Sequence, residues 1–271
     1  MERVLQADLD LLKDAAVRAG AIAMSFFRRN PNSWSKLGGS PVTEADIAVD
    51  NMLREELLRA RPEYGWLSEE TADDPARLER DAVFVVDPID GTRGFMAGDE
   101  RWCVSAAVVR EGRPVTAVLV APALSETYTA ISGRGAWLGS RRLAVSGWPG
   151  LRNAKLAGPR GWLKAGLFSA QKLRIEPHVP SLAYRIASVA SGSLDAAFAS
   201  PNSHDWDLAA CDLLVHEAGG LLTGLDGRAP IYNGESVLHG VLAASNQAMQ
   251  PDLLAALRKV ARERTEAGLP A

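Results

Sequence analysis

The sequence predicts a mixed α/β (α+β) fold in which helices and strands come from different parts of the chain. Two amphipathic helical patterns come first, five strand patterns follow, and strand and helix patterns alternate after a Gly- and Pro-containing run at 146–153. This order favours two subdomains. We expect a helix pair with a mostly antiparallel sheet over residues 1–148, and an α/β subdomain over residues 149–271.

The first two helices are predicted by apolar residues at steps of three and four. Such residues run from Leu5 to Phe27 and describe one face of a helix that ends before Pro31. Thr43 can cap a second helix, whose apolar face continues up to Pro62. Between the two helices we expect a loop, because residues 36–41 read KLGGSP.

The strand patterns are short apolar runs bounded by turn residues. In the first half of the chain they lie at 64–68, 82–87, 103–109, 114–122 and 126–132. Turns such as Glu111-Gly112-Arg113-Pro114 separate neighbours, so the sheet should be mostly antiparallel. The alternating patterns of the second half lie at 154–158, 181–192, 194–199, 205–220 and 240–245, followed by a last helix from Pro251.

The bulk composition describes a soluble globular chain. With 271 residues and 47% hydrophobic content, it can bury a large core. Its 30 basic and 33 acidic residues give a net charge of -3, which favours neither a nucleic-acid nor a membrane partner. Cys103 and Cys211 have no partner at ligand spacing, so we expect reduced thiols in a cytoplasm. The acidic N-terminus and the lack of a run of roughly 18 apolar residues predict no export signal or membrane anchor.

Two acids follow the predicted strand 82–86. Asp87 and Asp90 bracket a Pro-Ile dipeptide, and an ordinary turn would explain the Pro and the Gly that come with them. A turn does not explain two acids together near a buried strand end, where like charges repel unless a cation lies between them. Mg²⁺ is the natural partner, because it binds carboxylates, a backbone carbonyl and water in octahedral geometry.

Gly91 and Thr92 come directly after the second acid. If a helix starts here, its free N–H groups face the same cavity as the ions and can bind a phosphate oxygen. The pattern therefore predicts that metal ions and a phosphate group share one site.

Three separate motifs carry a resemblance to a known family. They are WLSEET at 66–71, DPIDGT at 87–92 and DWDLAACDLLVHEAGG at 205–220, with SPVTEAD at 40–46 as a further match. In this order they resemble the signatures of the inositol monophosphatase superfamily, in particular its bacterial 3'(2'),5'-bisphosphate nucleotidase and inositol monophosphatase branch. The resemblance implies a layered sandwich of alternating helix and sheet layers, with two subdomains and the active site between them.

The resemblance also implies a set of metal ligands. Glu69, Asp87 and the carbonyl of Ile89 would hold one Mg²⁺, and Asp87, Asp90 and Asp207 a second. A weaker third ion would reach Glu69 through water. For Asp207 the alternative is an acid in the first turn of a helix, where the helix dipole favours it.

In the family, the residue matching Asp46 accepts a hydrogen bond from the one matching Thr92, and that Thr helps to position and deprotonate the attacking water. Alternatively, Asp46 only completes the cap begun by Thr43. Glu70 would support the ligand shell. The implied reaction is direct hydrolysis of a phosphate monoester by water activated by Mg²⁺, with N–H groups near Gly91 and Thr92 holding the phosphoryl oxygens.

The substrate prediction depends on Arg93 and Ser200. Arg93 follows the DPIDGT motif and could neutralise a second phosphate, or it could be a surface residue. Ser200 stands where inositol phosphatases place an acid that contacts sugar hydroxyls. Both favour a 3'(2'),5'-bisphosphate nucleotide, such as adenosine 3',5'-bisphosphate converted to AMP. The alternatives are inositol 1-phosphate and histidinol phosphate.

An alternative of another class is a regulatory or RNA-associated interaction protein with secondary phosphatase activity. The near-neutral charge and the lack of a basic stripe argue against direct RNA binding. We therefore expect a small phosphorylated metabolite as the partner, in a cytoplasmic enzyme that is compatible with a homodimer.

Overall fold

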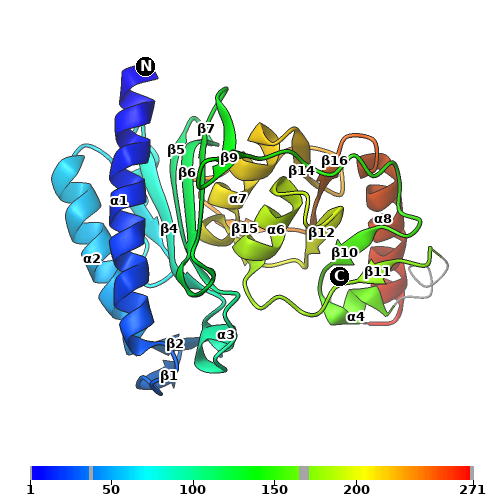
Figure 1. The fold of residues 1–271 in the computed structure, drawn as a ribbon, viewed down its shortest axis with the longest axis horizontal. Helices are drawn as coiled ribbons and strands as arrows, with labels where there is room; N and C mark the ends of the chain where they lie inside the picture. The colour runs from blue at the N-terminus through cyan, green and yellow to red at the C-terminus, as the bar shows by residue number, and fades with distance from the viewer. Residues whose placement is uncertain (1, 37–38, 165–170, 269–271) are drawn as a thin grey trace.

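The computed structural model describes residues 2–36, 39–164 and 171–268, so that Leu37 and Gly38 of the predicted loop lie outside the described residues. Helices and sheets alternate in layers (Figure 1). The predicted layered sandwich is confirmed. From one side to the other, the layers are α1 (Glu2–Phe26) with α2 (Glu44–Ala60), a seven-stranded sheet, α6 (Leu182–Ala190) with α7 (Asp205–Glu217), a five-stranded sheet, and α8 (Gln250–Glu266) with α4 (Arg160–Leu163).

The seven-stranded sheet is almost wholly antiparallel, as predicted; its one parallel pair is β3 with β4. Its strands, in spatial order, are β3 (Gly65–Ser68), β4 (Val83–Asp90), β5 (Cys103–Arg110), β6 (Arg113–Ala121), β7 (Glu126–Ile131), β8 (Gly135–Leu138) and β9 (Arg141–Arg142). The last two strands were not predicted, because they are too short to establish an alternating pattern.

α1 and α2 cover the outer face of this sheet. Their apolar stripes pack on the alternate residues of β4, β5 and β6 in one continuous core. Thr43 caps α2 as predicted, and Asp46 completes a capping box. The predicted loop at 36–41 is flanked by two short antiparallel strands, β1 (Ser33–Ser35) and β2 (Pro41–Thr43). β1 is exposed and β2 is largely buried, and both are too short to show an apolar pattern.

α6 and α7 form the middle layer. α7 is apolar nearly all round after its first turn, as expected for a helix buried between two sheets. One continuous apolar core joins these helices to both sheets. The division at residues 148 and 149 is therefore not marked by separate cores, and it stays a prediction.

The five-stranded sheet is mixed, and α8 packs on its outer face. Its strands, in spatial order, are β11 (Arg174–Ile175), β10 (Lys155–Ala157), β12 (Ala196–Ala199), β16 (Leu242–Asn246) and β14 (Gly220–Gly224). The smaller elements are η1 (Pro75–Glu79), α3 (Thr92–Met96), η2 (Pro122–Leu124), and the strand pair β13 (Ser203–His204) and β15 (Leu238–His239). Within the described residues, every helix is too short or too polar to cross a bilayer.

Candidate active site

β4 carries the first two acids. The strand continues beyond its predicted end through Pro88 and Ile89 to Asp90, with a shift of register against β5 between Asp87 and Asp90. Pro88 has no N–H for the ladder, and such residues are tolerated at bulges. Side chains three positions apart would point to opposite faces of a regular strand, but one extra residue brings them to the same side.

Asp207 reaches the same place from the first turn of α7. One carboxylate oxygen from each of Asp87, Asp90 and Asp207 lies within 4.8 Å of the other two. Asp207 also accepts a hydrogen bond from the backbone N–H of His204, at 2.7 Å, and so completes a capping box at the start of α7. Both interpretations of Asp207 therefore describe its position: it caps the helix and faces the other acids.

This triad of acids lacks a compensating cation. In the part of the chain that the structure describes, no Lys or Arg lies within ion-pair distance of Asp87, Asp90 or Asp207. Burial, followed by repulsion from neighbouring carboxylates, raises the pKa of Asp87 well above its usual range and that of Asp90 to about 7. Buried carboxylates in this situation bind protons or a metal ion, and the oxygen donor set is the one that Mg²⁺ takes.

Glu69 lies beside the triad but is engaged by a lysine. The Nζ of Lys36 is 3.0 Å from Glu69 Oε1 and 2.7 Å from Glu70 Oε1. Glu69 is still the neighbour that most raises the pKa of Asp87, after burial. An ion bound to Glu69 would compete with Lys36, a residue that no motif had indicated.

Asp46 and Thr92 meet as the resemblance implied. The Thr92 hydroxyl lies 3.2 Å from Asp46 Oδ1 and 3.1 Å from the Ile89 carbonyl oxygen. The other carboxylate oxygen of Asp46 accepts from the backbone N–H and the hydroxyl of Thr43, at 2.8 and 2.6 Å. Asp46 thus serves both as the cap and as the partner of Thr92. The Ile89 carbonyl retains a free lone pair for an ion.

The acids open into a small pocket of about 190 Å³. It is lined by Ser40, Pro41, Glu69, Asp87, Asp90, Gly91, Thr92, Arg93, Pro180 and Asp207. Arg93 is exposed at this pocket and donates to the carbonyl of Gly39 at 3.4 Å, with no carboxylate at ion-pair distance among the described residues. Ser200, which directly follows β12, is not among the lining residues.

Ser181 is a site residue that the sequence interpretation missed. Its hydroxyl donates to Asp90 Oδ2, and the N–H groups of Leu182 and Ala183 donate to the same carboxylate at 3.2 and 2.6 Å. The start of α6 therefore holds Asp90. A Ser before the apolar pattern of 182–190 is a helix-start signal, but it could not indicate which distant residue the helix end would meet.

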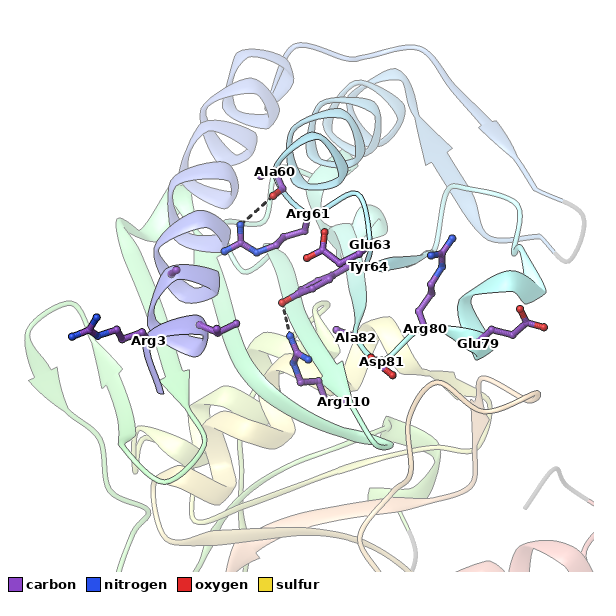
Figure 2. A pocket seen from close by; sticks show the side chains of 12 residues that line it. Arg3, Ala60, Arg61, Glu63, Tyr64, Glu79, Arg80, Asp81, Ala82 and Arg110 are labelled. Carbon is purple, nitrogen blue, oxygen red and sulfur yellow. Dashed lines mark hydrogen bonds between the residues drawn. The ribbon is translucent and has the colours of Figure 1, made fainter. Parts of the chain in front are cut away.

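A larger pocket lies at the opposite end of β4, near Ala82. It measures about 760 Å³, and Arg3, Arg61, Tyr64, Arg80 and Arg110 are among the residues that line it. Figure 2 shows the hydroxyl of Tyr64 facing Arg110 in this pocket. None of the predicted site residues lines it, so size alone would have directed attention away from the acids.

Comparison with known proteins identifies the family of this chain. Residues 4–262 match the Inositol monophosphatase family. The chain belongs to the inositol monophosphatase family. The family's members are phosphoric monoester hydrolases with a characteristic dependence on Mg²⁺, so the predicted membership and enzyme class are confirmed.

Individual members of the inositol monophosphatase family are similar over most of their length. A histidinol-phosphatase of Mycobacterium tuberculosis is 39% identical over 211 residues, which are 73% of this chain and 79% of that protein. An inositol-1-monophosphatase of Rhizobium meliloti is 32% identical over 243 residues, or 86% and 91% of the two chains.

Among solved structures, the extragenic suppressor protein suhB of Bartonella henselae superposes with a TM-score of 0.82 at 28% identity. That superposition covers 93% of this chain and 99% of the other. A Thermotoga maritima IMPase gives a TM-score of 0.84 at 26% identity over 97% and 99% of the two chains. The fold is therefore that of the family from end to end.

Proposed function

We propose that the chain hydrolyses a phosphate monoester of a small metabolite with Mg²⁺ held by Glu69, Asp87, Asp90 and Asp207. The observation that carries this proposal is the convergence of three carboxylates, two buried and one half-buried, without a Lys or Arg at ion-pair distance among the described residues. Two carboxylates from β4 and one from α7 offer hard oxygen ligands. A purely structural acid would instead be paired with Lys or Arg.

The proposed ligand sets are those that the family resemblance implies, and the approach of Asp87, Asp90 and Asp207 supports the second of them. Glu69, Asp87 and the Ile89 carbonyl would hold one ion, and Asp87, Asp90 and Asp207 a second, with a third reached from Glu69 through water. When bound, Mg²⁺ supplies Lewis-acid stabilisation of phosphoryl charge and a lowered pKa for water. The pairing of Lys36 with Glu69 supports an exchange in which the lysine leaves as an ion enters.

Thr92 and Asp46 are the proposed path for the proton of the attacking water. The Thr92 hydroxyl accepts a proton from water and passes its own to Asp46 Oδ1, which lies 3.2 Å away. The resulting hydroxide attacks phosphorus in line as the P–O bond to the leaving alcohol breaks, and the leaving oxygen takes a proton from a solvent water; no covalent intermediate with the protein forms. Gly91 and Thr92 line the pocket, and their N–H groups are the proposed donors to the phosphoryl oxygens.

For the substrate, we propose a 3'(2'),5'-bisphosphate nucleotide. Arg93 supports this choice, because it is exposed at the rim of the pocket and has no carboxylate partner among the described residues. A planar guanidinium pairs well with a second phosphate. Ser200 supports it less, since it lies outside the pocket lining.

Histidinol phosphate is the second candidate, and it is favoured by the 39% identity to a histidinol-phosphatase. Inositol 1-phosphate is favoured by the relatives named inositol-1-monophosphatase, at 32 to 33% identity. Cytoplasmic location and a homodimer remain predictions.

The test is a Mg²⁺-dependent phosphate-release assay on adenosine 3',5'-bisphosphate, inositol 1-phosphate and histidinol phosphate. We expect the highest kcat/KM for the bisphosphate. Arg93→Ala should reduce that value roughly tenfold to a hundredfold, because a charge-assisted contact is lost, and leave the other two esters unchanged. Arg262→Ala, at an exposed position of α8, is the matched control. Preference for another ester, or an equal Arg93→Ala effect on all three, contradicts the bisphosphate assignment and leaves the metal site standing.

A further inference from the structure

Arg185, in the second turn of α6, is a buried cation without an acidic partner. It is 6% exposed, and no described carboxylate lies within ion-pair distance of its guanidinium. Arg77 offers a direct contrast, since it is 3% exposed but pairs with Asp73 through two nitrogen atoms. Burying an unpaired charge costs several kcal/mol, so the position of Arg185 requires an explanation that Arg77 does not.

The guanidinium of Arg185 connects two segments. Its Nη1 donates to the carbonyl of Val179 at 3.4 Å, and its Nη2 donates to the carbonyl of Phe198 at 3.3 Å, while Nε has no partner. Val179 lies just before α6, and Phe198 lies near the end of β12. Arg185 therefore joins the chain that enters α6 to the neighbouring sheet.

The segment that enters α6 forms a wall of the proposed active site. Pro180 lines the pocket, and its ring packs on Gly94, where an added Cβ would lie 2.6 Å from Pro180 Cβ. A Cβ on Gly91 would lie 3.0 Å from the backbone nitrogen of Ser181. Because both contacts are tight, a shift of this segment would be transmitted to the turn that follows Asp90.

The same segment ends in the groups that hold Asp90. Ser181 and the N–H groups of Leu182 and Ala183 all donate to that carboxylate. In addition, Asp90 and Asp207 both raise the pKa of Arg185, against a larger lowering by burial. Arg185 therefore lies within electrostatic reach of Asp90 and Asp207, although no described carboxylate is at ion-pair distance.

We propose that Arg185 is a positioning residue for the metal site: it holds the segment 179–181 against β12 and so orients the start of α6 that fixes Asp90. This inference rests on the proposed metal site. Arg185 touches neither substrate nor ion, and it acts through Ser181 and Asp90.

The test measures Mg²⁺ binding by isothermal titration calorimetry together with kcat and KM. Arg185→Met should weaken Mg²⁺ binding about tenfold to a hundredfold, the usual effect of losing a residue that orients a ligand. We expect kcat to fall at a fixed subsaturating Mg²⁺ concentration, with little change in the substrate KM. Arg185→Lys, which retains the charge and can reach one carbonyl, should recover part of the loss.

Arg77→Met is the matched control, since it removes a buried arginine that contacts Asp73, Asn233 and Gly234 rather than the site. It should lower stability and leave Mg²⁺ affinity unchanged. Ser181→Ala should weaken Mg²⁺ binding too, and its effect should be less than additive with that of Arg185→Lys if both act through Asp90. Should Arg185→Met fail to fold, this pair of variants carries the test.

Equal or tighter Mg²⁺ binding by Arg185→Met would overturn the inference, because a residue acting by charge alone would repel the ion. Equal weakening in Arg77→Met would also overturn it. If the wild-type chain binds no Mg²⁺, both the metal site and this inference are overturned. If the wild type binds Mg²⁺ but neither Arg185→Lys nor Ser181→Ala changes the affinity, only the inference is overturned.

Discussion

Buried aspartates lie near both ends of β4, Asp8 near one end and Asp87 with Asp90 at the other, and they differ in whether a basic side chain pairs with them. Asp8 is fully buried and accepts hydrogen bonds from two residues that line the pocket of Figure 2, from Arg61 Nε at 2.9 Å and from the Tyr64 hydroxyl at 2.8 Å. Arg110 lies 3.9 Å away. Asp87 and Asp90 are buried to a similar degree, at 1% and 6% exposed, and have neither Lys nor Arg as partner among the described residues.

The difference distinguishes an acid that the chain itself pairs from acids that we propose bind metal ions. The carboxylate of Asp8 is satisfied by the chain itself, so its removal would leave Arg61 and Tyr64 without their partner. The carboxylates of the triad repel one another, so a cation bound between them would stabilise the folded chain. The larger pocket thus lies at the end of β4 near the paired acid, and the proposed metal site lies at the end with the unpaired acids.

The largest expected effect comes from neutralising one member of the triad. Asp90→Asn should lower kcat/KM by about three orders of magnitude or more, because one ligand is lost from an ion held by several carboxylates. The variant should remain folded in circular dichroism. Wild-type turnover by folded Asp90→Asn would contradict the proposal that Asp90, unlike Asp8, binds a metal ion needed for activity.

Thr92→Ala should lower kcat by about a hundredfold, since it removes the group that passes the proton of the attacking water. KM and Mg²⁺ affinity should change little, because the hydroxyl does not bind the ion. Asp46→Asn is expected to lower kcat similarly and, through the weakened cap of α2, to cost about 1 kcal/mol of stability. An unchanged kcat in Asp46→Asn would leave Asp46 as a cap only.

For Asp8, at the other end of β4, the expected effect is on stability alone. Asp8→Asn should lower the free energy of unfolding by about 3 kcal/mol, because Arg61 and Tyr64 lose the buried acid that they share. Urea titration measures the stability, and the phosphate-release assay should give wild-type kcat/KM for the folded protein. A selective loss of activity would contradict the assignment of Asp8 to the fold.

The smallest effect concerns pH in the absence of metal. Burial first, and then neighbouring acids, raise the pKa of Asp87 and that of Asp90, the latter to about 7. The folded chain therefore holds protons that the unfolded chain releases above about pH 4. Stability from these groups is complete below that pH and is lost as pH rises through about 7. With a chelator, the melting temperature should therefore fall between about pH 5 and about pH 8.

Saturating Mg²⁺ should suppress this fall, and Asp90→Asn should reduce it. The lowered pKa of His178 acts in the opposite direction, but it is a single exposed group. A melting temperature that rises with pH in the chelated wild type would contradict the raised pKa values.

The sequence by itself determined the local elements and the acids of β4. Periodic apolar residues predicted α1 and α2, since such spacing reports which face of a helix is buried, and Thr43 marked the start of α2. The DPIDGT motif indicated a metal and phosphate site, because two acids beside a buried strand need a cation. The position of Asp207 near them followed from a family resemblance rather than from any local pattern.

Only the tertiary structure decided which distant groups surround those acids. Ser181 and Asp90 are 91 positions apart, and Lys36 and Glu69 are 33 apart. Arg185 would be read from the sequence as one polar position in an apolar helix, yet the packing of α6 against β12 buries it without an acidic partner. Periodicity reports the burial of a face, whereas the identity of a partner depends on how whole layers pack, and that is set by contacts far apart in the chain.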